Sequence, residues 1–336
     1  MKTGRLADAV YGRSVHKKLK KLPENILHGA AGDDCAMFSL QKNGDAAAAA
    51  TYTGQMVYGG EHCGKYGVFA AVSQALAGGC VPKAAVLSLM LPADAQEATL
   101  QQIVEEARNA GESLGVPVAD VTASVTALVK EPVLTVTVLG QAGQSLKNAR
   151  KKAGMDVIMT KWAGLEGSAI LADVCRDRLL ERYPEYLVED AAAFDSCLSV
   201  IPELEVLTEA QKTFGAEICA ICAAGEGGVF RALWNLGTQA NAGLEVMLKK
   251  IPIRQETVEV CNHLDVNPYE LAAGGSLLLL ASQGEALVQE LNRAQIPAAV
   301  IGTVTDNNDR VIINGEERRF LEPAKADEIF KITEVF

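Results

Sequence analysis

The feature that most constrains the fold is a long apolar run, GKYGVFAAVSQALAGGCVPKAAVLSLMLP, at residues 64–92. Residues 64–79 predict a buried helix closed by Gly78 and Gly79, because glycine suits the backbone conformation that commonly ends a helix. Residues 84–92 predict a strand. A buried helix joined to a strand by two glycines favours a mixed layer of helices and strands.

The segments that follow extend this pattern. We predict a helix from Asp94, which suits an N-cap, to residue 114, and then strands at 116–128 and 132–140. A polar, basic segment, SLKNARKKAG (145–154), comes next. It predicts a boundary between domains at 1–147 and 154–336, which suits a chain of 336 residues. The fold class is therefore α+β, with mixed α/β layers in two domains.

The second half predicts further pairs of a strand and a helix. Strands are expected at 156–162, 216–223, 244–250 and 276–282, and a helix at 283–294. The end of the chain, RVIINGEERRFL (310–321), predicts a hairpin with Asn314-Gly315 as its turn.

Composition excludes several classes of protein. The net charge is −11, which argues against a nucleic-acid partner, because phosphate binding needs clustered Lys and Arg. No segment reaches the ~20 apolar residues of a membrane span, and the N-terminus lacks the apolar core of a secretion signal. The eight cysteines are scattered, as in a reduced, cytoplasmic protein. Cys219 and Cys222 form a CxxC, which we interpret as part of a buried strand or as a metal or redox pair.

Three glycine-bearing turns are candidates for binding an anion. They are GAAGDD (29–34), AGLEG (163–167) and AAGEGG (223–228), and the last two lie between a predicted strand and a predicted helix. Such turns let backbone amides approach a phosphate at a helix N-terminus, although tight packing is the more frequent explanation for each of them. None matches GxxxxGK[ST] or GxGxxG. The candidate residues in these turns are Gly32, Asp33, Asp34, Gly164, Glu166, Gly167, Glu226, Gly227 and Gly228.

Polar and aromatic side chains near these turns suggest specific roles. Asp33 and Asp34 could bind Mg²⁺ through carboxylate oxygens, or cap backbone amides. Lys161 could meet a phosphate or carboxylate, and Trp162 could stack on a ring; packing explains both equally well. Glu166 could serve as an acid or base, or interact with the start of a helix.

Several motifs, in order along the chain, resemble those of the AIR synthase (PurM-like) superfamily, and in particular of hydrogenase-maturation proteins of the HypE type. The motifs are GDDCAMF, GKYGVFAAV…AGGCVP, GVPV, GLEGSAIL, GEGGVFRAL, IPI…NPYELAAGG and AVIGTV. The resemblance implies two domains, the first pairing through its sheet into a homodimer. It also implies ATP and Mg²⁺ in a cleft between the domains, and ATP-dependent dehydratase, ligase or kinase-like chemistry.

The resemblance also implies acids that this chain lacks. Ser73-Gln74 stands where Asn-Asp is expected, Thr53-Gly54 has no aspartate, and Gly274 replaces an acid. The aspartate of the next strand is absent or shifted to Asp120, which joins Asp33 and Asp34 as a candidate metal ligand. The sequence ends Glu334-Val335-Phe336, without the terminal cysteine of the HypE type.

Two functional hypotheses follow from these departures. In the first, the protein binds a nucleotide or another phosphorylated small molecule, while the usual ATP–Mg²⁺ chemistry is in doubt. In the second, it is a non-catalytic homodimeric scaffold that works with a maturation partner protein.

Overall fold

The computed structural model describes residues 60–143, 146–150, 153–322 and 326–332, residues 10, 13 and 14, and the backbone of strands at 26–28, 36–38 and 47–56. The chain divides into two compact units, centred on Asp33–Gln144 and on Ser145–Lys331. We call them the N-terminal and the C-terminal unit. The domains predicted at 1–147 and 154–336 stay a prediction beside this division.

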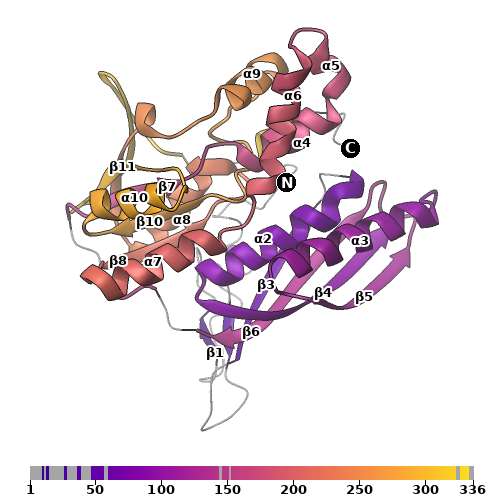
Figure 1. Cartoon of the computed structure of the whole chain (residues 1–336), viewed down its shortest axis with the longest axis horizontal. Helices are drawn as coiled ribbons and strands as arrows, with labels where there is room; N and C mark the ends of the chain where they lie inside the picture. Colours follow the sequence, from indigo (N-terminus) through magenta and orange to yellow (C-terminus); the bar gives the residue numbers. More distant parts are fainter. Residues whose placement is uncertain are drawn as a thin grey trace. The chain divides into compact units, whose positions relative to one another are not determined.

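The N-terminal unit contains a six-stranded sheet in the order β1-β2-β3-β6-β4-β5. Strands β4 and β5 are parallel, and the other neighbours are antiparallel. Helices α2 and α3 pack together over this sheet (Figure 1). The elements are β1 (Ile26–His28), β2 (Ala36–Phe38), β3 (Ala47–Met56), the 3-10 turn η2 (Gly60–His62), α2 (Cys63–Ala77), β4 (Cys80–Leu91), α3 (Glu97–Ser113), β5 (Val118–Val125) and β6 (Val133–Ala142).

One face of this sheet is covered and the other is open. Leu89 and Leu134 pair across β4 and β6 and are almost completely buried. Side chains of the opposite face include Met90 and Leu139, which are 39% and 44% exposed. Successive side chains of a strand point to opposite faces, so this alternation is that of a sheet covered by helices on one side.

The predicted helix at 64–79 is confirmed as α2, which ends at Ala77 with Gly78 as its C-cap. A Cβ atom at Gly64 would lie 2.1 Å from the carbonyl oxygen of Ile103, so glycine permits the close packing of α2 on α3. The N-cap prediction for Asp94 is wrong. The N-cap of α3 is Gln96, without a side-chain cap, and Asp94 lies in the preceding turn.

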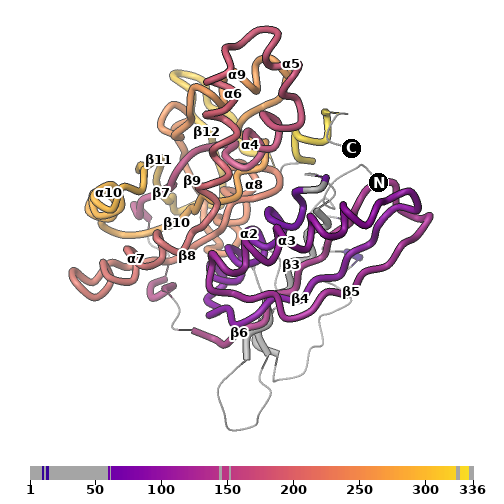
Figure 2. Tube along the Cα trace, turned by 45° about the vertical axis from the view of Figure 1, so that its right-hand side comes forward, coloured from indigo at the N-terminus to yellow at the C-terminus, as the bar shows by residue number. Residues whose placement is uncertain are grey.

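The C-terminal unit contains a seven-stranded sheet in the order β13-β12-β9-β11-β7-β10-β8. Figure 2 traces this unit, with strands β7 to β12 labelled. Its elements are β7 (Asp156–Thr160), α4 (Leu165–Val174), α5 (Arg176–Leu180), α6 (Glu185–Ala192), η3 (Ala193–Cys197), α7 (Ile201–Phe214), β8 (Ile218–Ala223), α8 (Gly228–Ala240), β9 (Gly243–Met247), η4 (Leu248–Lys250), α9 (Gln255–Leu264), β10 (Leu277–Ala281), α10 (Gly284–Arg293), β11 (Ala298–Thr305), β12 (Arg310–Asn314), β13 (Glu317–Phe320) and η5 (Glu328–Lys331).

The core of this unit lies between α8 and the central strands. Val157, Leu278 and Leu280 of the sheet pack in one cluster with Leu233 and Leu236 of α8. Cys222 is fully buried in the same cluster, which confirms the interpretation of 216–223 as a buried strand. Within the described ranges, no three His, Cys, Asp or Glu side chains gather as metal ligands would.

Two local predictions need correction. The strand expected at 244–250 ends at Met247, because the pairing of β9 with β12 ends there and residues 248–250 turn into a 3-10 helix. The hairpin turn is shifted by one residue. Asn314 still pairs with Glu317, so the two-residue loop is Gly315-Glu316, and Gly315 supplies the positive φ of 64°. Of the helices that the structure describes, none is long and apolar enough to cross a membrane.

Candidate functional site

Two of the three predicted glycine turns meet at one edge of the C-terminal sheet. Strands β7 and β8 are both antiparallel to β10, so they run in the same direction and end at the same edge. The turn 163–167 follows β7 and the turn 223–228 follows β8, while the loop 272–275 leads into β10 at that edge. We call these three segments the glycine junction. The remaining predicted turn, with Gly32, Asp33 and Asp34, lies outside the described residues.

The turn 163–167 is joined to the rest of the glycine junction by a backbone hydrogen bond and by close packing. Gly164 is the N-cap of α4, with a left-handed φ of 64°. The amide of Gly167 donates to the carbonyl oxygen of Ala272 at 2.8 Å. A Cβ atom at Gly167 would lie 2.4 Å from Cγ of Leu271, so this glycine is required for packing.

The turn 223–228 is packed with similar closeness. Gly227 and Gly228 both have positive φ, of 83° and 63°. The amide of Gly227 donates to Oδ2 of Asp327 at 2.5 Å. The amide of Ala273 donates to the carbonyl oxygen of Gly225 at 3.2 Å, which joins the loop 272–275 to this turn. Several amides that an anion would need are therefore already used inside the protein.

Two carboxyl groups are buried in the glycine junction. Glu166 and Asp327 are each 2% exposed. Burial, followed by the charge of Asp327, raises the pKa of Glu166 to about 8, and the amide of Gly274, which donates to its Oε2 at 3.2 Å, opposes this shift. Burial also raises the pKa of Asp327 to about 7, although amide hydrogen bonds oppose it. Glu226, in the same junction, is half-buried.

Lys161 is buried directly after β7 and is held by the protein itself. Its Nζ donates to the carbonyl oxygens of Cys197, Ser199 and Gly275 at 2.9, 2.6 and 3.0 Å. It also lies 2.8 Å from Oε1 of Glu203, a fully buried carboxylate. These contacts favour a structural role, and the predicted contact with a ligand anion stays a prediction.

Trp162 is half-buried beside an aromatic and a cationic side chain. Its ring centroid lies 5.7 Å from that of Phe194, and the guanidinium carbon of Arg254 lies 5.3 Å from it. Arg254 also pairs with Glu256 at 2.9 Å, and the hydrogen bond from Arg254 lowers the pKa of Glu256. A planar ligand would compete with Arg254 for Trp162, so the predicted stacking on a ligand ring remains a prediction.

Of the three predicted metal ligands, only Asp120 is among the described residues. Asp120 is exposed on β5, at the edge of the N-terminal sheet, and its Oδ1 accepts from the amide of Val121 at 2.9 Å. Asp33 and Asp34 are not among the described residues, so the magnesium site stays a prediction.

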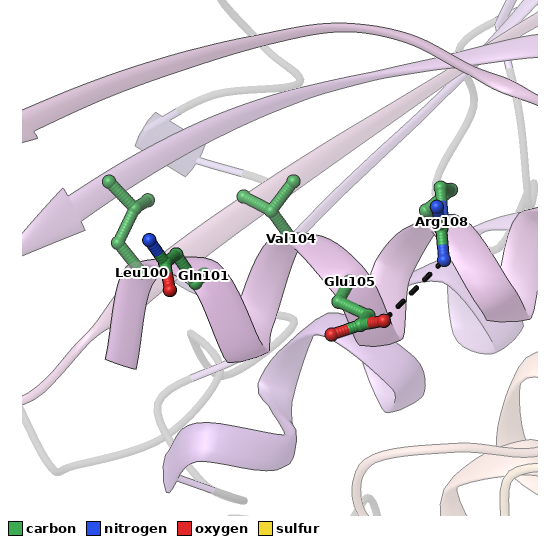
Figure 3. A pocket seen from close by; sticks show the side chains of 5 residues that line it. All are labelled: Leu100, Gln101, Val104, Glu105 and Arg108. Atoms are coloured by element: carbon green, nitrogen blue, oxygen red, sulfur yellow. Dashed lines mark ion pairs between the residues drawn. The ribbon is translucent and has the colours of Figure 1, made fainter. Parts of the chain in front are cut away.

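A shallow groove on the outer side of α3 is not a convincing alternative site. It is lined by Leu100, Gln101, Val104, Glu105 and Arg108, all from the same helix (Figure 3). Glu105 and Arg108 form an exposed ion pair at 3.6 Å. Small-molecule sites normally contain polar groups that converge from several elements, whereas the polar residues lining this groove all lie on α3.

Sequence reasoning missed Asp327 and Glu203. Asp327 contacts a glycine 100 residues earlier in the chain, so no local spacing pointed to it. The only local signal is the segment ADEIFKI (326–332), in which acids stand next to apolar residues near the end of the chain. Glu203 follows Pro202 in the first turn of α7, where an acid is ordinary at the positive end of a helix.

Comparisons with known proteins agree with this fold. Residues 32–142 match the AIR synthase related protein N-terminal domain, and residues 152–314 match the C-terminal domain. A protein of Methanocaldococcus jannaschii named for hydrogenase expression and formation is 23% identical over 310 residues, which cover 88% of this chain and 87% of that protein.

Solved structures show the same fold. A HypE–HypF complex matches 87% of this chain and 93% of the other, with 19% identity and a TM-score of 0.64. HypE in complex with ATP matches 93% and 95%, with 18% identity and a TM-score of 0.60. The chain therefore belongs to the AIR synthase related (PurM-like) family, and its fold is similar to that of HypE hydrogenase-maturation proteins.

Proposed function

We propose that this protein binds a nucleotide or another phosphorylated small molecule, with ATP and Mg²⁺ as the first ligands to test. The observation that carries the proposal is the glycine junction. There, two strands that run in the same direction are each followed by a turn whose left-handed glycine, Gly164 or Gly227, is the N-cap of a helix. The N-termini of α4 and α8 thus lie at one edge, where the helix dipole favours an anion. Likeness in fold to a structure with bound ATP supports the choice of ligand.

The half-buried residues of this region define the ligand contacts that we propose. Trp162 would stack on the base, and Glu226 would lie near the metal or a ligand hydroxyl. Gly164 and the more deeply packed residues Lys161, Glu166, Gly167, Gly227 and Gly228 would shape this edge. Asp33 and Asp34, which follow the candidate ligand-binding residue Gly32, are the carboxylates that we propose for the metal, with Asp120 as a further proposed metal ligand.

Nucleotide binding can be measured through Trp162, because the chain contains only two tryptophans. In a Trp234→Phe protein, Trp162 is the sole tryptophan, and we expect Mg-ATP to quench its fluorescence and to release heat in calorimetry. Trp162→Phe should abolish the quenching and weaken binding, and Trp234→Phe should bind as the wild type does. ADP and AMP show which phosphates matter. No heat from any of the three at millimolar concentration would exclude the nucleotide proposal.

A second candidate function is a homodimeric scaffold that binds a maturation partner. The amides of Gly167, Gly227 and Gly228 are all used in internal hydrogen bonds, which favours packing over ligand binding. The fold is also that of a HypE crystallised with HypF. For the homodimer, we propose that the open face of the N-terminal sheet is the interface. Its exposed apolar residues, Met90 and Leu139, support this assignment.

The homodimer proposal predicts that a charge on the open face separates the subunits. We expect the wild type to sediment as a dimer, and Met90→Lys and Leu139→Glu to sediment as monomers. Leu180→Lys is the matched control, because Leu180 is comparably exposed at 37% but lies on α5 of the other unit. A purified HypF-type protein, added without nucleotide, tests the scaffold role. A wild-type monomer that does not bind this protein would refute the second candidate.

A further inference from the structure

The short segment at residues 326–331 packs on the rest of the C-terminal unit through buried side chains and hydrogen bonds. Ile329 is completely buried, and Oε2 of Glu328 accepts from the amide of Asn267 at 2.9 Å. The amide of Glu328 donates to the carbonyl oxygen of Glu270 at 3.3 Å. The segment therefore packs against the loop that leads into the glycine junction.

Asp327 connects this segment to the turn 225–228. Its Oδ2 accepts from the amide of Gly227 at 2.5 Å, and its Oδ1 accepts from the amide of Ile329 at 2.9 Å. These donors are neutral backbone amides, which stabilise a carboxylate less than a cation does. Because the side chain is almost completely buried, the ionised form of Asp327 is costly here.

Glu166, in the first turn of α4, binds the loop 272–275 through a hydrogen bond. Its Oε2 accepts from the amide of Gly274 at 3.2 Å. A Cβ atom at Gly274 would lie 2.7 Å from this same oxygen, so only glycine leaves room for the carboxyl group. Glu166 therefore holds the loop 272–275 on the first turn of α4, while Asp327 holds segment 326–331 on the turn 225–228.

The charged and titratable groups around this pair leave an excess of negative charge. Glu226 of the turn adds to the charge felt by both acids. Lys331 is paired with Glu328 within the segment at 2.5 Å. Arg231 of α8 is buried against Gly227, where a Cβ atom would lie 2.4 Å from its Nε. Burial, followed by the charges of Glu328 and Asp327, raises the pKa of Cys261 in α9 to about 12.

We propose that Glu166 and Asp327 form a proton-dependent clamp, in which Asp327 holds segment 326–331 on the turn 225–228 and Glu166 holds the loop 272–275 on the first turn of α4. Protons close this clamp, and their loss opens it. The raised pKa values, about 8 for Glu166 and about 7 for Asp327, mean that the closed state binds protons more tightly than the open state. Closure is therefore strongest below the ordinary carboxyl pKa values of about 4, and it weakens as pH rises to about 8.

Hydrogen exchange of the clamp amides tests this proposal without any ligand, so its outcome is independent of the proposed nucleotide binding. We expect the protection of Gly227, Gly274 and Ile329, corrected for the intrinsic exchange rate at each pH, to fall about tenfold or more between pH 5.5 and pH 8.5. A Glu166→Gln, Asp327→Asn double variant keeps an oxygen acceptor at both positions but cannot ionise. It should retain high protection at both pH values.

Asp156→Asn is the matched control. Asp156 accepts from the amide of Gly284 at the start of α10 at 2.9 Å, as Asp327 does at α8. This variant should keep the wild-type pH dependence at the clamp. Protection of the wild type that does not change with pH would overturn the proposal. The proposal would also be overturned if the double variant kept the wild-type pH dependence. Loss of protection in β7 and β10 together with the clamp would overturn it too, because it would show global unfolding.

Discussion

Replacing Lys161 by methionine is expected to destabilise the C-terminal unit by about 3–5 kcal/mol, the usual cost of breaking a buried ion pair by removing one partner. The substitution leaves the carboxylate of Glu203 buried, and apart from Lys161 no hydrogen-bond donor of the described residues reaches its oxygens. It also removes the donor to the carbonyl oxygens of Cys197, Ser199 and Gly275. These carbonyls belong to two segments, residues 197–199 and the loop 272–275, which the side chain of Lys161 joins.

Scanning calorimetry measures this effect. A loss of this size should lower the unfolding temperature of the C-terminal unit by about 6 °C or more. A Lys161→Met, Glu203→Leu double variant is the matched control, because it removes the whole ion pair and leaves no charge buried. We expect it to recover much of the lost stability. If the single variant unfolds at the wild-type temperature, the ammonium is not structural, and the ligand role of Lys161 becomes the better explanation.

Replacing Gly228 by alanine is expected to destabilise the protein by about 3 kcal/mol or more, as the sum of two effects. The residue has a φ of 63°, which disfavours any side chain. The new Cβ atom would also lie 2.6 Å from the carbonyl oxygens of Tyr269 and Leu271. Both are backbone atoms, so the loop itself must move to accept the methyl group.

Gly215→Ala separates these two contributions. Gly215 ends α7 with a similar φ of 68°, but a Cβ atom there would have no neighbour within 4 Å. We expect it to cost about 1–2 kcal/mol, from the backbone conformation alone. Calorimetry of both variants gives the steric contribution as the difference. If Gly228→Ala and Gly215→Ala lost the same stability, the loop around Gly228 would accept a methyl group without a steric cost.

Elements with strong local patterns were predicted well from the sequence. The apolar residues of 64–77 form α2, and SLLLLAS forms β10, since both are long or apolar enough to be recognised without tertiary information. The errors fall on element ends. Asp94 has the right side chain for a cap, but the backbone begins the helix three residues later, and a cap depends on that backbone position.

The candidate site was less predictable, because its defining contacts join distant segments. The turn 163–167 and the turn 223–228 were recognised from their glycines, and the structure brings them together. The partners of the buried groups were not recognised, since Lys161 meets Glu203 on another helix and Gly227 meets Asp327 near the end of the chain. Acidic side chains are usually exposed and solvated, so the sequence gives no indication that Glu203 and Asp327 are buried.

The strand order of the C-terminal sheet has a consequence for how the chain is made. Strand β7 is flanked by β10 and β11, which come much later in the sequence, and among the described strands β8 has only β10 as its neighbour. During translation, β7 and β8 therefore emerge from the ribosome without any strand to pair with. At typical rates of synthesis this interval lasts on the order of ten seconds. Throughout this interval the unpaired edges of two mostly buried strands are open to aggregation.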